Sequence, residues 1–246
     1  MATKVVKAFP KAIPNEALVQ KVSSILEPYG YGESTLFCSS ICSDELARQL
    51  ETDFGKVYGP HFSLGGLSGF AFGGVTGFHA MASHIPTDGS CLIVFGPHVG
   101  IDSDGIIGRA HRRGRDLTDS CCGSANAAAA YVADVRAGRT INSFPPTDTL
   151  DAEQSFVANT LLPYGLRLEQ ATNPVVELPL ILYEAQYTLI QRIVAAKCQQ
   201  VGGDGKIALL GGVQVNTPSG DSDYFLPLCF ELRNNKGGLI KNLLWN

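Results

Sequence analysis

The most informative stretch of this 246-residue chain is Cys91-Leu92-Ile93-Val94-Phe95-Gly96-Pro97-His98. Five consecutive apolar residues predict a strand that is covered on both faces, as strands are in a parallel sheet. Gly96 and Pro97 end this strand, because proline cannot donate a hydrogen bond to a sheet ladder. We therefore expect His98 to project from the carboxyl end of a buried strand, where the sites of open α/β sheets gather.

A second strand is predicted just before Cys42. Residues 35–41 form an apolar run that is rich in small residues. Ser43 is a candidate cap for a helix that carries Leu46 and Leu50 and ends at Gly55. We therefore expect Cys42 to lie at a strand-to-helix turn.

A helix is predicted just after Cys122. The alanine-rich residues 125–135 have strong helix propensity, and Gly138 ends the segment. At the start of a helix the positive end of the dipole favours a thiolate over a thiol. The sulfur of Cys122 is therefore expected to be ready to bind a metal ion.

The rest of the chain alternates helical and strand patterns. Asn15 is a candidate cap for an amphipathic helix that Pro28 ends, and later helices are predicted over 152–161 and 180–198. Closing strands are predicted over 207–215 and 225–232. This order predicts a single α/β domain over residues 1–246, with a mixed, partly parallel sheet flanked by helices.

The segment 59–89 is dense in glycine, with Phe62, Phe70, Phe72 and Phe78 interleaved. It is predicted to be a long irregular loop, and loops of that length usually have a function.

Composition limits the partners. The net charge is −4 and the pI is near 5.7, and the longest basic cluster is Arg112-Arg113-Gly114-Arg115. We expect no nucleic-acid partner and interpret this cluster, with His111, as a solvated turn. The chain has no run of 18 or more apolar residues, so no membrane span is predicted. Its seven cysteines, an odd number, favour a reducing compartment over a disulfide framework. A small-molecule partner is the favoured prediction.

Cys42, His98 and Cys122 together suggest a zinc enzyme. Two thiolates and one imidazole leave the fourth zinc position free for water or substrate. Cys121 competes with Cys122 as a ligand, and a Cys122 nucleophile activated by His98 is another interpretation. Free cysteines are also common in protein cores, which is the interpretation for the remaining four, Cys38, Cys91, Cys198 and Cys229.

Three further polar residues are candidates for the same site. Asp44 and Arg48 are four residues apart, so their side chains would pair on one face of a helix. A solvated surface ion pair is the plainer interpretation. His84 is a candidate for proton movement or for a hydrogen bond behind the ligands, and a structural hydrogen bond within its loop is equally compatible.

Beyond these patterns the chain resembles the low-carbon-dioxide-inducible protein B/C family, which is also called the theta-class carbonic anhydrases and is related to the beta class. The resemblance spans most of the chain. The matching segments are Gly74–Phe78 through Ser83–Pro86, Phe95–Ile101, Cys122-Gly123 and Leu210–Thr217.

The resemblance implies a fold like that of beta carbonic anhydrases and a zinc ion held by Cys42, His98 and Cys122. Asp44 and Arg48 look like the aspartate–arginine dyad of beta-class enzymes, although beta-class enzymes place the arginine two residues after the aspartate. A homodimer and a chloroplast location are also implied. Gly123 favours Cys122 over Cys121, because glycine allows close backbone approach and Cys122-Gly123 matches the family.

The expected function is zinc-dependent hydration of carbon dioxide to bicarbonate in algal carbon concentration. The main alternative is a catalytically silent zinc-site homologue that acts as a bicarbonate-binding or partner subunit. A different hydrolytic zinc enzyme is a further alternative, which would need a wider polar cleft.

Overall fold

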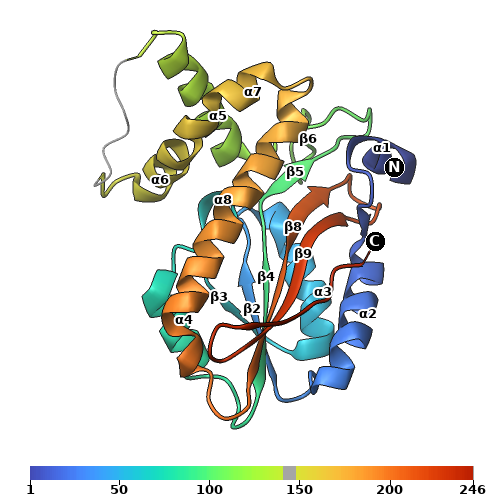
Figure 1. Ribbon diagram of the computed structural model, residues 1–246. Coiled ribbons are helices and arrows are strands. Elements are labelled where there is room, and N and C mark those ends of the chain that lie inside the picture. The colour runs from blue at the N-terminus through green and yellow to red at the C-terminus, as the bar shows by residue number, and fades with distance from the viewer. Residues whose placement is uncertain (141–147, 246) are drawn as a thin grey trace.

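A mixed sheet organises the computed structural model, which describes residues 1–140 and 148–245 (Figure 1). Strands β8, β4, β2 and β3 run parallel, and β9 runs antiparallel to β8. The predicted mixed, partly parallel sheet flanked by helices is confirmed. In spatial order the strands are β1 (Ile13–Pro14), β9 (Tyr224–Asn234), β8 (Lys206–Asn216), β4 (Ser90–Phe95), β2 (Thr35–Ser40) and β3 (His61–Ser63), with β10 (Leu239–Asn242) on β9 and β5 (His98–Gly100) on β8.

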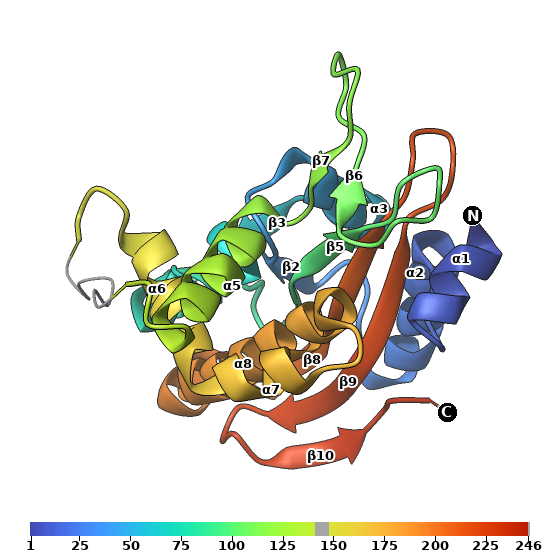
Figure 2. The same ribbon diagram turned by 90° about the horizontal axis from the view of Figure 1, so that it is seen from above.

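Helices cover both faces of the sheet, and Figure 2 shows α2 and α8 on opposite sides of it. Alternate residues of the parallel strands point to opposite faces, as the two-residue period of a strand requires. One face packs Phe37, Leu92, Val94, Ala208 and Leu210 against α2 (Asn15–Leu26) and α3 (Arg48–Tyr58). The other packs Cys38, Cys91, Ile93, Ile207 and Leu209 against α4 (Gly74–Ala82) and α8 (Pro174–Lys197).

A second group of helices lies beyond the carboxyl ends of the parallel strands (Figure 1). It consists of α5 (Gly123–Arg136), α6 (Ala152–Leu161), α7 (Gly165–Gln170) and the first turns of α8, and its core includes Val132, Val157, Leu161, Leu168 and Leu178. Among the residues described, no helix combines the length and apolar character needed to span a membrane.

Smaller elements complete the chain. A hairpin of β6 (Arg109–Ala110) and β7 (Asp119–Ser120) projects from the molecule (Figure 2), and α1 (Ala2–Ala8) lies near the N-terminus. The 3₁₀ turns are Glu27–Tyr29, Glu45–Ala47, Leu67–Gly69, Leu162–Tyr164 and Cys198–Gln200.

The prediction of an irregular loop over 59–89 is wrong. That segment contains β3 and the nine-residue helix α4. Phe78 and Met81, three residues apart on α4, are fully buried in the core that α8 shares. Burial of this apolar face outweighs the low helix propensity of the glycines, since tertiary packing supplies most helix stability.

The helix after Cys42 also differs from its prediction. Asp44, not Ser43, is the cap: its Oδ1 accepts a hydrogen bond of 3.0 Å from the amide of Leu46. A 3₁₀ turn over Glu45–Ala47 follows, and α3 begins only at Arg48 and continues past Gly55 to Tyr58.

Gly96 lets the chain leave β4 and enter β5. A Cβ atom at this position would overlap the backbone carbonyl oxygen of Gly212, so only glycine fits. The close approach places β5 alongside β8, with His98 opposite Gln214. The position of His98 therefore depends on two glycines that contact each other across the sheet.

We expect Gly96→Ala to lower the free energy of unfolding by about 1–3 kcal/mol, the usual cost of an overpacked core position. Chemical denaturation monitored by circular dichroism measures the change. Gly55→Ala is the control, because a Cβ there meets no atom within 4 Å and the site lies inside α3. It should stabilise the protein by roughly 0.5–1 kcal/mol. Equal stability of Gly96→Ala and the original chain would contradict this account.

Candidate metal centre

Cys42, His98 and Cys122 meet at one edge of the sheet. Cys42 comes two residues after β2, His98 opens β5 directly beyond β4, and Cys122 is the residue before α5. All three side chains are almost completely buried, with exposed fractions of 2%, 2% and 4%. Their ligand atoms lie within 4.8 Å of one another. The structure thus brings together all three residues that the sequence proposed as ligands.

The spacing of the two sulfurs fits a metal ion. The Sγ atoms of Cys42 and Cys122 are 3.7 Å apart. Two sulfurs that each lie about 2.3 Å from a tetrahedral zinc ion are expected about 3.8 Å apart. The donor set of two sulfurs and one imidazole is also one that zinc prefers. This cluster could hold a metal ion.

The orientation of His98 fits the same ion. Its Nδ1 donates a 2.8 Å hydrogen bond to Oδ1 of Asn216. Its Nε2 is buried and has no hydrogen-bond partner. A buried imidazole nitrogen without a partner is costly, unless a metal ion takes its lone pair. Nε2 is therefore the ligand atom that the geometry offers.

The contact between the two thiols shifts the pKa of each in opposite directions. A hydrogen bond from the Cys42 thiol lowers the pKa of Cys122 well below its usual range, and His98 and the Ala125 amide act in the same direction. The same hydrogen bond, together with burial, raises the pKa of Cys42. Burial opposes protonation of His98, but the sulfur atoms of Cys121, Cys122 and Cys42 around the ring favour the charged form and raise its pKa overall. The cluster therefore already favours a thiolate at Cys122.

Asp44 places a carboxylate beside the three ligands. Its Oδ2 lies 3.9 Å from Nε2 of His98. The guanidinium of Arg112 donates hydrogen bonds to both carboxylate oxygens, at 3.0 Å to Oδ1 and 2.7 Å to Oδ2. Burial alone would raise the pKa of Asp44, but the hydrogen bonds from Arg112 and the Leu46 amide outweigh it and hold the pKa well below its usual range. Asp44 is thus a fixed anion at the rim of the cluster.

The expected pair of Asp44 with Arg48 is not formed. Arg48 instead contacts Glu51 at 2.7 Å and donates to the backbone carbonyl of Cys42. The helical spacing rule does not apply to this pair, because Asp44 precedes a 3₁₀ turn and α3 begins only at Arg48. The arginine that pairs with Asp44 is Arg112, in the loop between β6 and β7, which the sequence suggested was only a solvated turn.

His84 does not lie beside the cluster. It is exposed, between the end of α4 and the start of β4, and its ring packs edge-on against Phe62. His98 lies past the opposite end of the same strand. The prediction of a role for His84 behind the ligands is therefore not supported in this chain, where the ring contacts Phe62.

Cys121 lies on the other side of the imidazole. Its Sγ is 3.5 Å from Nδ1 of His98, the nitrogen that already bonds Asn216. The peptide bond between Cys121 and Cys122 is cis. The geometry thus favours Cys122 as the ligand, whereas Cys121 contacts the back of the histidine. The other four cysteines, Cys38, Cys91, Cys198 and Cys229, are buried and apart from the cluster.

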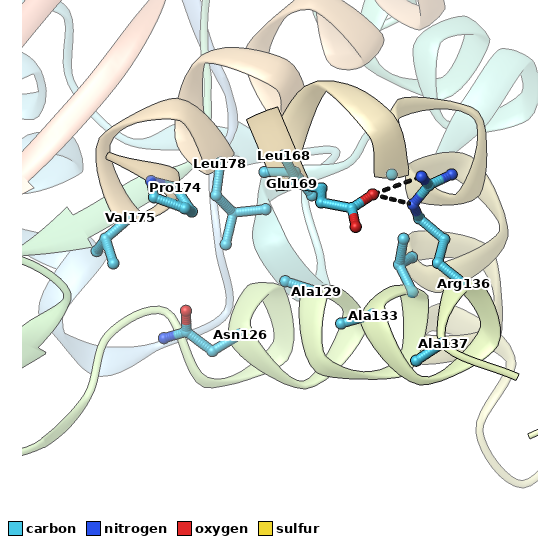
Figure 3. A pocket seen from close by; sticks show the side chains of 12 residues that line it. Asn126, Ala129, Ala133, Arg136, Ala137, Leu168, Glu169, Pro174, Val175 and Leu178 are labelled. Carbon is cyan, nitrogen blue, oxygen red and sulfur yellow. Dashed lines mark hydrogen bonds and ion pairs between the residues drawn. The ribbon is translucent and has the colours of Figure 1, made fainter. Parts of the chain in front are cut away.

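An apolar groove approaches the cluster from the helical side. Figure 3 shows it between α5 and the α7–α8 corner, with an ion pair of Arg136 and Glu169 at one end. Its volume is about 370 Å³. A smaller cavity touches His98, Cys121 and Cys122, and it shares three lining residues with the groove, Asn126, Val175 and Leu178.

Comparisons with known proteins agree with this geometry. The chain is 46% identical to PtLCIB4, a homolog of the limiting CO₂-inducible protein LCIB, over 99% of this chain and 100% of that one, with a TM-score of 0.94. A mutant of PtLCIB4 matches at 45% identity over 98% and 97% of the two chains, with a TM-score of 0.93. LCIB itself shares the fold, at 19% identity over 98% of each chain and a TM-score of 0.74.

No curated protein gives a significant match. The family model of the limiting CO₂-inducible proteins B/C beta carbonic anhydrases matches residues 12–234, which is most of the chain. The resemblance seen in the sequence is confirmed, and the chain belongs to the limiting CO₂-inducible protein B/C family of beta carbonic anhydrases.

Proposed function

We propose that this protein catalyses the reversible hydration of carbon dioxide to bicarbonate with one zinc ion, as a carbonate dehydratase of the lyase class. The observation that carries the proposal is the buried set of Cys42, His98 and Cys122, with the unpartnered Nε2 of His98 turned toward it and the Asp44 carboxylate beside it. A zinc ion in such a site lowers the pKa of a bound water to about 7 and so supplies a nucleophile for carbon dioxide at neutral pH.

The chain's own residues would hold and orient the reactants. Cys42, Cys122 and Nε2 of His98 would hold the metal. Asp44 is an acceptor fixed at the rim, so its Oδ2 would accept the hydrogen bond of the reacting water and orient its lone pair. Arg112 would keep Asp44 in that role, since two hydrogen bonds fix both carboxylate oxygens.

The surroundings favour a small apolar substrate. The ligands are almost fully buried, which excludes the wide polar cleft that a peptide or large ester would need. The apolar groove shares lining residues with the inner cavity of about 10 Å³ that touches His98 and Cys122. Both features favour carbon dioxide over the substrates of other hydrolytic zinc enzymes.

A catalytically silent zinc-site homologue is the second candidate. The close approach of Asp44 Oδ2 to Nε2 of His98, at 3.9 Å, favours it. If Arg112 released Asp44, the carboxylate would be near enough to occupy the open metal position and close the site. Such a protein would serve as a bicarbonate-binding or partner subunit in carbon concentration.

Two further proposals rest on the family alone. We propose that the protein acts as a homodimer and that it works in the chloroplast of an alga.

Stopped-flow hydration of carbon dioxide, with zinc counted on the same sample, tests the main proposal. We expect about one zinc per chain and activity that a chelator removes and added zinc restores. Full zinc without activity would favour the silent homologue. Protein without zinc would contradict both candidates.

Serine substitutions test the choice of ligands. Cys42→Ser and Cys122→Ser should each lose zinc after dialysis, because a serine hydroxyl replaces a thiolate ligand. Cys121→Ser, the matched control one residue away, should keep about one zinc per chain. The assignment fails if Cys121→Ser loses the metal and Cys122→Ser retains it.

Arginine substitutions test the control of Asp44. Arg112→Ala should lower kcat/KM for carbon dioxide about 10- to 100-fold, as loss of a partner behind a metal site typically does. Arg113→Ala removes an exposed arginine from the same loop and should change kcat/KM less than twofold. Equal losses in both variants would assign the effect to the loop as a whole and contradict the role of Arg112.

A further inference from the structure

The end of β8 carries a buried amide that the proposed chemistry does not yet use. Asn216 closes this strand within the segment Leu210–Thr217, and only 2% of its surface is exposed. Its side chain makes four hydrogen bonds, one of which is a long contact of 3.9 Å from the Cys121 thiol to Oδ1. Oδ1 accepts from Nδ1 of His98 at 2.8 Å, and Nδ2 donates to the Leu46 carbonyl at 2.8 Å and to Oδ2 of Asp223 at 3.0 Å.

We propose that Asn216 and Asp223 are positioning residues that fix which nitrogen of His98 faces the metal. This inference rests on the proposed zinc site and names the residues that prepare it. Asn216 touches neither metal nor substrate, so it would act only through His98.

The hydrogen bonds allow only one orientation of the Asn216 amide. A carbonyl oxygen and a carboxylate oxygen can only accept hydrogen bonds, so the amide NH₂ must face Leu46 and Asp223. The amide oxygen must then face His98. A flipped amide would set its oxygen against the Leu46 carbonyl and the Asp223 carboxylate, which is costly in a dry interior.

The orientation of Asn216 in turn selects one form of His98. Because Oδ1 of Asn216 accepts, Nδ1 of His98 must carry a proton and donate it. The lone pair of the neutral imidazole is then on Nε2, which is the unpartnered atom of the cluster. The amide thus leaves Nε2 as the ring nitrogen whose lone pair a metal ion would take.

Asp223 is itself held in place. Its Oδ1 accepts hydrogen bonds from the amide of Thr217 at 2.8 Å and from the Thr217 hydroxyl at 3.4 Å. The backbone carbonyl of Asp223 accepts from the amide of Asn15 at 2.9 Å. The second carboxylate oxygen therefore points at Asn216 without freedom to turn away.

The same amide links the histidine to the turn that carries Asp44. Nδ2 of Asn216 donates to the backbone carbonyl of Leu46. The backbone amide of Leu46 in turn donates to the side chain of Asp44, which is the cap of this turn. Asn216 therefore sets His98 and the Asp44 turn relative to each other.

Zinc affinity, measured by competition with a chromophoric chelator, tests the pair. Asn216→Leu keeps the branched shape and removes every hydrogen bond of the amide, so we expect zinc affinity to fall 10- to 100-fold. In Asp223→Ala the zinc affinity should fall less, because Oδ1 of Asn216 can still accept the hydrogen bond from Nδ1 of His98. Asn235→Leu is the matched control, because that amide donates to the backbone carbonyls of Val201 and Gly203 near the other end of β8. The zinc affinity of this variant should stay within twofold of the original.

A second measurement is independent of zinc. In ¹⁵N-labelled metal-free protein, NMR should show that the Nδ1 proton of His98 exchanges slowly with solvent. The same proton should exchange fast in Asn216→Leu. Asn216→Ala serves instead if the leucine variant fails to fold. An unprotected Nδ1 proton in the original chain would overturn the proposal.

The outcomes separate the inference from the proposed function. Zinc binding that depends on Asn216, without hydration of carbon dioxide, would refute the activity and leave the positioning role intact. Zinc affinity within twofold of the original in Asn216→Leu would overturn the positioning role even in an active enzyme. If the original chain binds no zinc, the positioning role is decided by whether Asn216 protects the Nδ1 proton of His98 from exchange with solvent.

Discussion

The parallel register of β2, β4 and β8 is the constraint on which the site depends. Ser40 lies opposite Phe95, and Phe95 lies opposite Gly211, so the three strands reach the same edge together. β2 and β4 lead within three residues to Cys42 and His98, and β8 ends at Asn216, which bonds His98, whereas Cys122 comes from the start of α5. A shift of one strand by a single residue would exchange its two buried faces and move the site residue that it carries to the other side of the sheet. Burial of both faces therefore fixes the metal centre as well as the core.

The places of the candidate ligands in the chain were predictable, because each one follows from the sequence pattern immediately around it. An apolar run followed by Gly96 and Pro97 is enough to place His98 at a strand end, and an alanine-rich helix is enough to place Cys122 at a helix start. Long amphipathic patterns also predicted α2 and α6 closely, over Asn15–Leu26 and Ala152–Leu161. Helix α4 was missed because its stability comes from contact with α8, which local sequence does not reveal.

The partners of the ligands were not predictable from local pattern. Arg112 is 68 residues from Asp44, and Asn216 is 118 residues from His98. Neither spacing follows from a helix or strand period, since both contacts are made by tertiary structure. Arg48 looked like the partner of Asp44 only because the chain from 44 to 48 was taken as continuous α-helix. The basic cluster at Arg112 and the matched segment ending in Asn216-Thr217 were the signals available, and neither identifies its partner.

The charges of the site then follow from these partners. With zinc bound, two thiolates and a neutral His98 make the ion and its ligands neutral together. Asp44 and the exposed Glu45 both pair with Arg112 at the rim, where the side chain of Arg112 is 21% exposed. A buried charge is tolerated when it is paired and hydrogen-bonded, and here each charge meets that condition separately. The interior of the site is thus neutral toward an uncharged substrate such as carbon dioxide.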